Sequence, residues 1–288
     1  MSKKFTDRLA TVVLWLVGAF IIAVLVWFLQ YTVGQGWSQL SWKFLTTRPS
    51  ELDAGGGIGP QLFNTFYILV LSLAFSLPVG LGAGIYLAEY AKKSWLSDMV
   101  RLSTESLASV PSVVFGLFGS IIFVTTFKMG FTILGGAAPL ALLNLPVLVR
   151  VTEEAIRAVP FSYREASYSL GATKWQTVYR VILPSALPSL ITGINLVAGR
   201  ALGESAILIF TAGLSVSRKM FDFSLMAPGE TLAVHLWYVR SEGLVSDANA
   251  IANGSAAVLI LAVLAFNLVV GIPSRMLYKR YTGKASFF

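Results

Sequence analysis

The charged residues best placed to do chemistry lie inside or beside long uncharged stretches of the chain. Arg200 and Glu204 are four residues apart in the apolar stretch after Pro184, so on a helix they share one face. Arg200 would lie about 24 Å along that helix. If the helix crosses a membrane, charges at this depth face a cavity or each other, and the planar arginine fork suits an oxyanion. The two residues therefore form either an anion site or a self-neutralising pair between helices.

A second charged group follows another uncharged run and consists of Arg150, Glu153, Glu154 and Arg157. Helical spacing lets Arg150 reach Glu153 or Glu154, and it lets Glu153 reach Arg157. From these residues alone, a solvated helix end is the favoured interpretation.

Several other kinds of chemistry are excluded. The chain has no cysteine, which excludes thiolate metal sites and cysteine nucleophiles. Its one histidine, His235, lies in a polar stretch and is expected on the surface rather than as a ligand. No arrangement of carboxylates or hydroxyls suggests a hydrolase, and the glycine run at 55–59 lacks the Gly-Lys-Ser/Thr of a nucleotide-binding loop. We therefore expect no enzyme activity and no cofactor in this chain, and any ATP must be held by another subunit.

The polar segment at 161–184 carries the densest set of helix signals. Ser162 with Glu165, and Thr173 with Gln176, have the spacing of two capping boxes. Each box predicts the start of a short helix within this segment.

Gly171, between the two predicted helices, can end the first one in a left-handed turn that a side chain would penalise. Ala166 and Ser167 are small, so a groove on another protein could close around the first helix. The alternative is an amphipathic loop that lies on the bilayer.

The elements that must position these residues are membrane helices. Of the 288 residues, 56% are hydrophobic and 12% are charged, against about 25% charged in soluble domains. A span needs about 20 apolar residues. Six runs reach or approach this length: 9–29, 63–88, 106–127, 129–149, 181–199 and 248–274. The fifth is expected to continue through Arg200 and Glu204 to about residue 212.

Positive charge predicts the orientation of these spans. With a cytoplasmic N-terminus, fifteen of the 22 Lys and Arg residues fall in inner segments and six in outer ones, while Arg200 lies in a span. This asymmetry follows the positive-inside rule and places both termini in the cytoplasm. The net charge of +8 is thus topological, with a secondary attraction to anionic membrane lipid, and needs no nucleic-acid partner.

The polar segment also has the spacing of a known signature. Glu165-Ala166-Ser167 is followed by Gly171, by the aliphatic Val181 and then by Leu183-Pro184. This pattern resembles the EAA motif of ABC importer permeases, with serine in place of the second alanine and valine in place of the usual isoleucine.

Further motifs extend the resemblance to the PstA family of phosphate permease subunits over about residues 55–215. They are 56–60 with 63–65, 86–90, 105–108 with 110–116, and 199–204. The resemblance implies an all-α, polytopic membrane protein of six transmembrane helices with a MetI-like permease core. It implies an N-terminal helix and outer loop at 1–54, the core at 55–280 and a cytoplasmic tail at 281–288. Within the core, 161–184 would be the cytoplasmic coupling segment.

The resemblance also implies a function and partners. The chain would be the phosphate permease subunit of a bacterial inner-membrane importer. It would pair with a PstC-like second permease, a PstB-like ATPase dimer that holds ATP and magnesium, and a PstS-like periplasmic phosphate-binding protein. Glu165, Ala166, Ser167 and Gly171 would couple the chain to the ATPase.

In the PstA family, an Arg-x-x-Glu pair and a later arginine are implicated in phosphate translocation. They correspond to Arg150, Glu153 and Arg200, with Glu204 as a further candidate in the pathway. Three alternatives stay open: a permease for another oxyanion such as sulfate or molybdate, a proton-coupled secondary transporter that uses Arg200 and Glu204, and a membrane scaffold that carries no flux.

Overall fold

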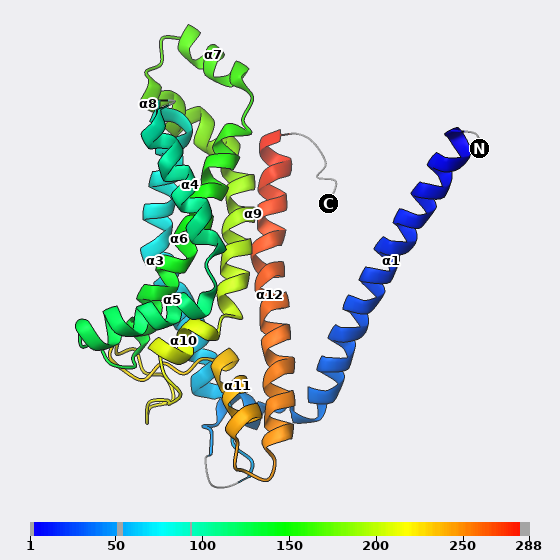
Figure 1. Cartoon of the computed structure of the whole chain (residues 1–288), viewed down its shortest axis with the longest axis vertical. Coiled ribbons are helices and arrows are strands. Elements are labelled where there is room, and N and C mark those ends of the chain that lie inside the picture. Colours follow the sequence, from blue (N-terminus) through cyan, green and yellow to red (C-terminus); the bar gives the residue numbers. More distant parts are fainter. Residues whose placement is uncertain (1–2, 51–53, 93, 283–288) are drawn as a thin grey trace.

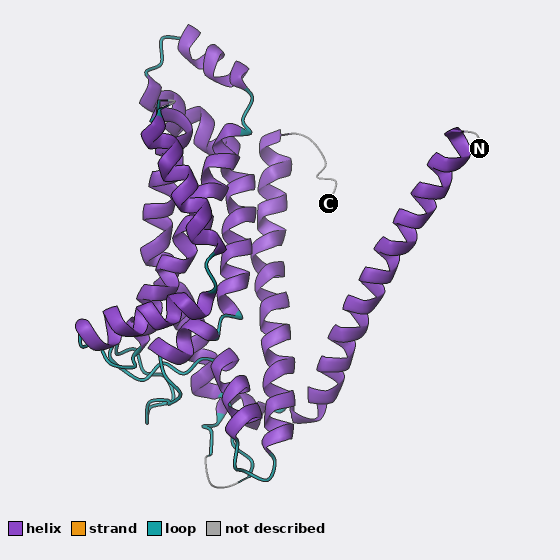
Figure 2. Ribbon diagram, in the orientation of Figure 1, coloured by secondary structure: helices purple, strands orange, loops and turns teal. Residues whose placement is uncertain are grey.

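The computed structural model describes residues 3–50, 54–92 and 94–282, and this part of the chain is almost entirely helical (Figure 2). Its only β contact is an isolated bridge between Val216 and Gly229. The α-helices are α1 (Lys3–Gly36), α2 (Trp42–Thr46), α3 (Gly59–Ile85), α4 (Trp95–Ser109), α5 (Ser112–Gly119), α6 (Ile133–Arg157), α7 (Phe161–Ser169), α8 (Lys174–Thr177), α9 (Leu183–Leu202), α10 (Ala206–Thr211), α11 (Leu232–Glu242) and α12 (Ala248–Thr282). Shorter turns of π-helix follow α3, α5 and α8 at Tyr86–Tyr90, Ser120–Thr126 and Val178–Ile182.

Five helical runs in the described residues are long and apolar enough to cross a membrane. They are Asp7–Gln39, Gly59–Tyr90, Ile133–Arg157, Lys174–Leu202 and Ala248–Ile272. They correspond to five of the six predicted spans. The predicted tail at 281–288 falls largely at 283–288, outside the described residues.

The third span is not the single helix that the uncharged run at 106–127 predicts. It begins earlier, as α4 at Trp95, and is broken between Ser109 and Ser112, where α5 turns away by 96°. Val110 lies in the extended region with ψ of 132°, the geometry that the ring of a following proline, here Pro111, favours over the helical one. Figure 1 shows α5 lying across the upright helices.

The fifth span is also shorter than the sequence predicts. Its helix α9 ends at Leu202, and after a turn at Gly203 and Glu204 the chain starts the separate helix α10. Figure 1 shows α10 lying across the bundle beside α5.

The core of the bundle is built on close packing of α3 against α6. A Cβ atom added at Gly80 would lie 2.7 Å from the Cβ atom of Leu148, and one at Gly84 would collide with Thr152. The missing side chains thus let the two backbones approach, as small residues do between membrane helices. As a result, α3 and α6 form one tightly packed unit.

The start of α1 and the end of α12 lie at the same end of the bundle as α7 (Figure 1), which we call the α7 end. Helix α1 diverges from α12 toward this end (Figure 1). At the opposite end the two helices meet where Gly36 contacts Asn253 and Ala257. The most apolar window of α1 has none of its residues buried within the chain, so its surface is free for lipid or another subunit.

Candidate functional site

Helices α7 and α8 form a helical hairpin (residues 161–177) that projects from the α7 end of the bundle (Figure 1). Gly171 joins them with φ of +80°, the left-handed geometry predicted for it. Thr173 and Gln176 form a complete capping box at the start of α8, which confirms the second box.

The first predicted capping box, Ser162 with Glu165, is not formed. Helix α7 begins at Phe161 after Pro160, and no side chain caps its N-terminus. Pro160 occupies the N-cap position, and its ring offers no acceptor for the N–H groups of the first turn.

The three motif residues of α7 face different ways. Glu165 and Ala166 are exposed, whereas Ser167 is buried and its Oγ lies 2.9 Å from Thr177 Oγ1. This hydrogen bond braces α7 against the end of α8. The small residue at 167 therefore joins the two helices of the hairpin.

Several apolar side chains of the hairpin are exposed. Leu170 is 89% exposed, and four aromatic side chains of the hairpin are also exposed: Phe161, Tyr163, Tyr168 and Trp175. Exposed apolar side chains in this number are typical of a protein interaction site.

Of the two partners that helical spacing allows for Arg150 in the charged group on α6, the structure shows Glu154. Arg150 does not bind Glu153 in the described structure; its Nε donates to Glu154 Oε1 at 2.9 Å and its Nη1 reaches Glu105 Oε1 at 3.4 Å. Glu153 is buried, with a side chain only 11% exposed. Since α6 is helical through Arg157, residues 150 and 154 lie one turn apart, while Glu153 points toward α4.

The partner of Glu153 across the helices is Arg101, which sequence reasoning missed. Arg101 Nε donates to Glu153 Oε1 at 2.8 Å, and its Nη2 donates to the carbonyl of Leu87 at 3.2 Å. Arg157 contributes a second bond to Glu153 Oε1 at 2.7 Å. No sequence signal marks a contact between residues 52 positions apart, because only the packing of α4 on α6 brings them together.

These side chains line a cavity of about 240 Å³ toward the α7 end of the bundle. Its charged lining comprises Arg101, Glu105, Arg150, Glu153, Glu154 and Arg157. Three guanidinium groups and three carboxylates thus balance one another around a space that could admit a small ion. A solvated helix end explains Arg150 and Glu154, but it does not explain the buried Glu153.

Arg200 and Glu204 do not share a helix face. Arg200 lies in the last turn of α9, whereas Glu204 lies beyond its end and accepts the backbone N–H of Ala206 at 3.1 Å. The predicted shared face and the alternative of a self-neutralising pair are therefore wrong, since Glu204 instead satisfies a donor at the start of α10. Arg200 is exposed, and its guanidinium has no hydrogen bond or ion pair within the described part of the chain.

His235 is not on the surface. It is buried, and its Nδ1 lies 3.1 Å from Glu230 Oε1, while Gln61 Nε2 donates to Glu230 Oε2 at 2.8 Å. Asn64 on α3 also donates to the Glu230 carbonyl at 3.0 Å. The cluster joins the segment before α11 to the start of α3. His235 is therefore part of a buried contact between these segments, which its polar sequence context does not indicate.

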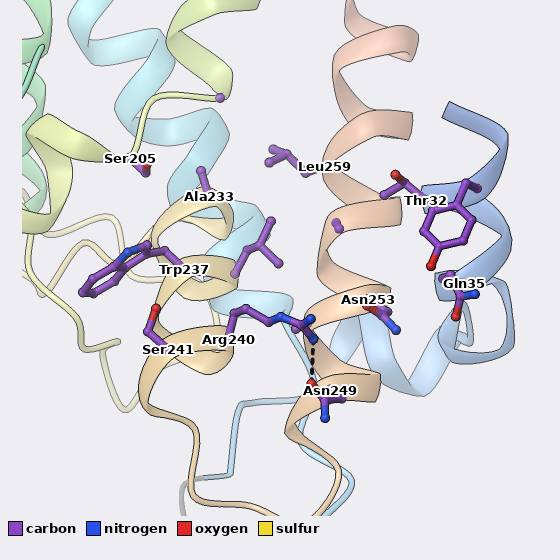
Figure 3. Close-up of a pocket in the computed structure, with 15 residues that line it drawn as sticks. Thr32, Gln35, Ser205, Ala233, Trp237, Arg240, Ser241, Asn249, Asn253 and Leu259 are labelled. Atoms are coloured by element: carbon purple, nitrogen blue, oxygen red, sulfur yellow. Dashed lines mark hydrogen bonds between the residues drawn. The ribbon is translucent and has the colours of Figure 1, made fainter. Parts of the chain in front are cut away.

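A larger cavity, of about 790 Å³, opens between α1, α11 and α12 at the end opposite α7. Figure 3 shows Arg240 reaching across it to Asn249, and Arg240 Nη1 donates to Asn249 Oδ1 at 2.6 Å. Its remaining lining is neutral, from residues such as Gln35, Trp237 and Asn253. No Asp or Glu side chain lines this cavity among the described residues.

These features define a class: a multi-pass helical membrane protein with charged side chains between its helices and an apolar hairpin at one end. Residues 80–283 match the family model of the binding-protein-dependent transport system inner membrane component. The chain belongs to this family, and it is accordingly a permease subunit of a bacterial ABC importer. Family membership rules out the alternative of a secondary transporter.

Similar proteins support the assignment. The chain is 47% identical to the probable ABC transporter permease protein YqgI of Bacillus subtilis (strain 168), over 98% of this chain and 99% of that relative. It is 33% identical to the phosphate transport system permease protein PstA of Yersinia pestis, over 94% of this chain and 90% of the relative. Among solved structures, the MetNI methionine ABC transporter in inward facing conformations aligns with a TM-score of 0.60 at 19% identity, covering 74% of this chain and 94% of that one. The expected MetI-like permease fold is confirmed.

Proposed function

We propose that this chain carries inorganic phosphate as one permease subunit of an ATP-driven importer. The observation that carries the proposal is the similarity to phosphate permeases over most of the chain. Arg200 supports it, because it has no partner among the described residues and occupies the position that the resemblance links to phosphate translocation. Arginine binds such oxyanions through parallel N–H donors.

Arg200 would meet phosphate in transit. Its guanidinium is exposed near the end of α9 and has no acidic partner in the described residues. A charge that faces hydrocarbon would be costly, so Arg200 must face a hydrated pathway or a neighbouring subunit. Glu204, which is committed to the start of α10, would shape the end of α9 rather than bind the anion.

The cavity around Glu153 would serve as a gate toward the α7 end. Arg150 is exposed and holds Glu154 and Glu105 through surface pairs, which contribute little stability. It can therefore exchange a carboxylate for a passing phosphate. Glu153, bound by Arg101 and Arg157, would keep α4 attached to α6 while Arg150 changes partners.

The α7–α8 hairpin would dock on a separate ATPase subunit, which would hold the ATP and magnesium. The exposed Leu170 and exposed aromatic side chains of the hairpin would enter a groove on that subunit, and Glu165 would face its rim. A dimer of such ATPases, a second permease and a periplasmic phosphate-binding protein would complete the importer. In this arrangement the α7 end and both termini would lie in the cytoplasm, as the charge asymmetry of the sequence predicts.

The proposal is tested by uptake of radiolabelled phosphate in cells that carry the full importer, with unlabelled sulfate, molybdate or phosphate as competitors. Phosphate is expected to compete and the other two anions are not. Competition by sulfate or molybdate at equal concentration would favour the alternative of a permease for another oxyanion. Absence of uptake of any of the three would favour a scaffold without flux.

A further inference from the structure

A buried ion pair joins the α7–α8 hairpin to the end of α3. Arg164 lies on α7, and Glu89 lies in the π-helical turn Tyr86–Tyr90 that follows α3. Their side chains are only 12% and 7% exposed. Arg164 Nη2 and Nε donate to the same oxygen, Glu89 Oε1, at 2.6 and 3.0 Å. The pair is therefore short, shielded from water and held by two donors.

The same guanidinium also binds the end of α6. Arg164 Nη1 donates to the carbonyl of Val159 at 2.8 Å, and Nη2 donates to the carbonyl of Ile156 at 3.0 Å. Carbonyl groups at a helix C-terminus lack partners within the helix, and a cation there also complements the helix dipole. One side chain thus connects three elements: the hairpin, the end of α3 and the end of α6.

The two helices that Arg164 joins are already packed as a unit through Gly80 and Gly84. A displacement of α7 would therefore move α3 and α6 together rather than bend either one. A second link, Lys174 Nζ at 4.9 Å from the centroid of the Tyr90 ring, involves an exposed side chain, and such cation–π contacts are weaker when solvated.

We propose that Arg164 and Glu89 form the strut that transmits motion of the ATPase-bound hairpin to the transport pathway. The inference rests on the proposed docking of the hairpin on an ATPase. Both are positioning residues: they touch no phosphate and act through α3 and α6. Arginine is required because its planar fork serves one carboxylate and two carbonyls at once, whereas a lysine is a single point charge.

The first test compares Arg164→Lys and Glu89→Gln with the controls Arg8→Lys and Glu242→Gln, which change exposed side chains. Membrane abundance, ATPase capture, ATP hydrolysis and phosphate uptake are measured on the complete importer. For the two strut variants we expect capture and hydrolysis close to wild type, with uptake per ATP reduced at least about tenfold. An unchanged ratio of uptake to hydrolysis in both variants would overturn the proposal.

A second test restores the strut covalently and guards against a folding defect. The chain has no cysteine, so Glu89→Cys combined with Arg164→Cys gives this subunit two thiols. With partner subunits that are also free of cysteine, no other thiol of the importer can react with the reagent. Bridging them with a short, reducible bifunctional thiol reagent is expected to raise uptake, and reduction is expected to lower it again. Uptake that stays the same or falls on bridging would show that the two positions need not stay joined.

A third readout does not depend on which anion passes. Tyr86, at the start of the same π-helical turn, is 59% exposed, and the thiol labelling rate of Tyr86→Cys is expected to change when ATP is added to the complex. Arg164→Lys is expected to abolish that change. If it does so in a complex that takes up no phosphate, the substrate assignment fails and the strut stands. If the chain with Arg164 intact shows no ATP-dependent change, the strut fails.

Discussion

Replacing Arg200 by glutamine separates its role in transport from any role in stability. The guanidinium is exposed and makes no hydrogen bond or ion pair with the rest of the described chain. Its removal therefore leaves no buried partner unsatisfied, and such surface substitutions change stability by at most about 0.5 kcal/mol.

The effect on transport is expected to be larger. Hydrogen bonds to a charged group contribute about 1.5–3 kcal/mol each. Losing one such contact to phosphate in the rate-determining step would slow uptake by about 10- to 100-fold, at about 1.4 kcal/mol per tenfold. Arg200→Lys keeps the charge but loses the fork, so its rate is expected to fall between those of glutamine and wild type.

The assay is the initial rate of phosphate uptake at limiting phosphate, normalised to the amount of the subunit in the membrane. Arg8→Gln, which removes an exposed arginine near the start of α1, controls for the loss of one positive charge. Wild-type flux in Arg200→Gln would refute the reasoning. So would an equal loss of flux and of membrane abundance, which would assign Arg200 a structural role.

Four further substitutions test the surrounding structure. Arg101→Gln removes one of two partners of the buried Glu153 and is expected to destabilise the subunit by about 1–3 kcal/mol. Arg150→Gln breaks only exposed pairs and is expected to cost about 0–1 kcal/mol. Equal melting temperatures of the two variants in detergent would contradict this ranking. Glu230→Ala strips the buried cluster of its acceptor and is expected to lower stability by about 2–4 kcal/mol in the same melting assay, and a shift no larger than that of Arg150→Gln would show that the cluster is dispensable. Gly171→Val forces a branched side chain into a left-handed turn at about 1–2 kcal/mol, so ATPase capture by the complex is expected to weaken, and undiminished capture would argue against the hairpin geometry.

The length of the apolar runs identified five membrane helices, because apolar runs of that length seldom occur outside membrane spans. It failed for the third span, because apolar composition is the same on both sides of the break at Pro111. The proline was visible in the sequence, but only the geometry shows that Val110 is extended and that the chain turns there.

The candidate site was predicted only in part, for a related reason. Sequence spacing gives contacts within one helix, and it correctly paired Glu153 with Arg157. It could not give Arg101, nor the contact of Arg164 with Glu89 across 75 positions, since both depend on how separate helices pack. The burial of His235 was missed because a polar outer segment folds back onto α3.

The most direct measurement of the central claim uses Leu170, the most exposed apolar residue of the hairpin. Leu170→Asp places a charge on the surface that should enter the ATPase groove, while leaving the fold of the membrane helices intact. Binding of the ATPase and ATP-dependent phosphate uptake are measured on the same preparation. We expect both to be lost together. Phosphate uptake that persists after the ATPase has dissociated would contradict the claim that a separate motor drives transport through this hairpin.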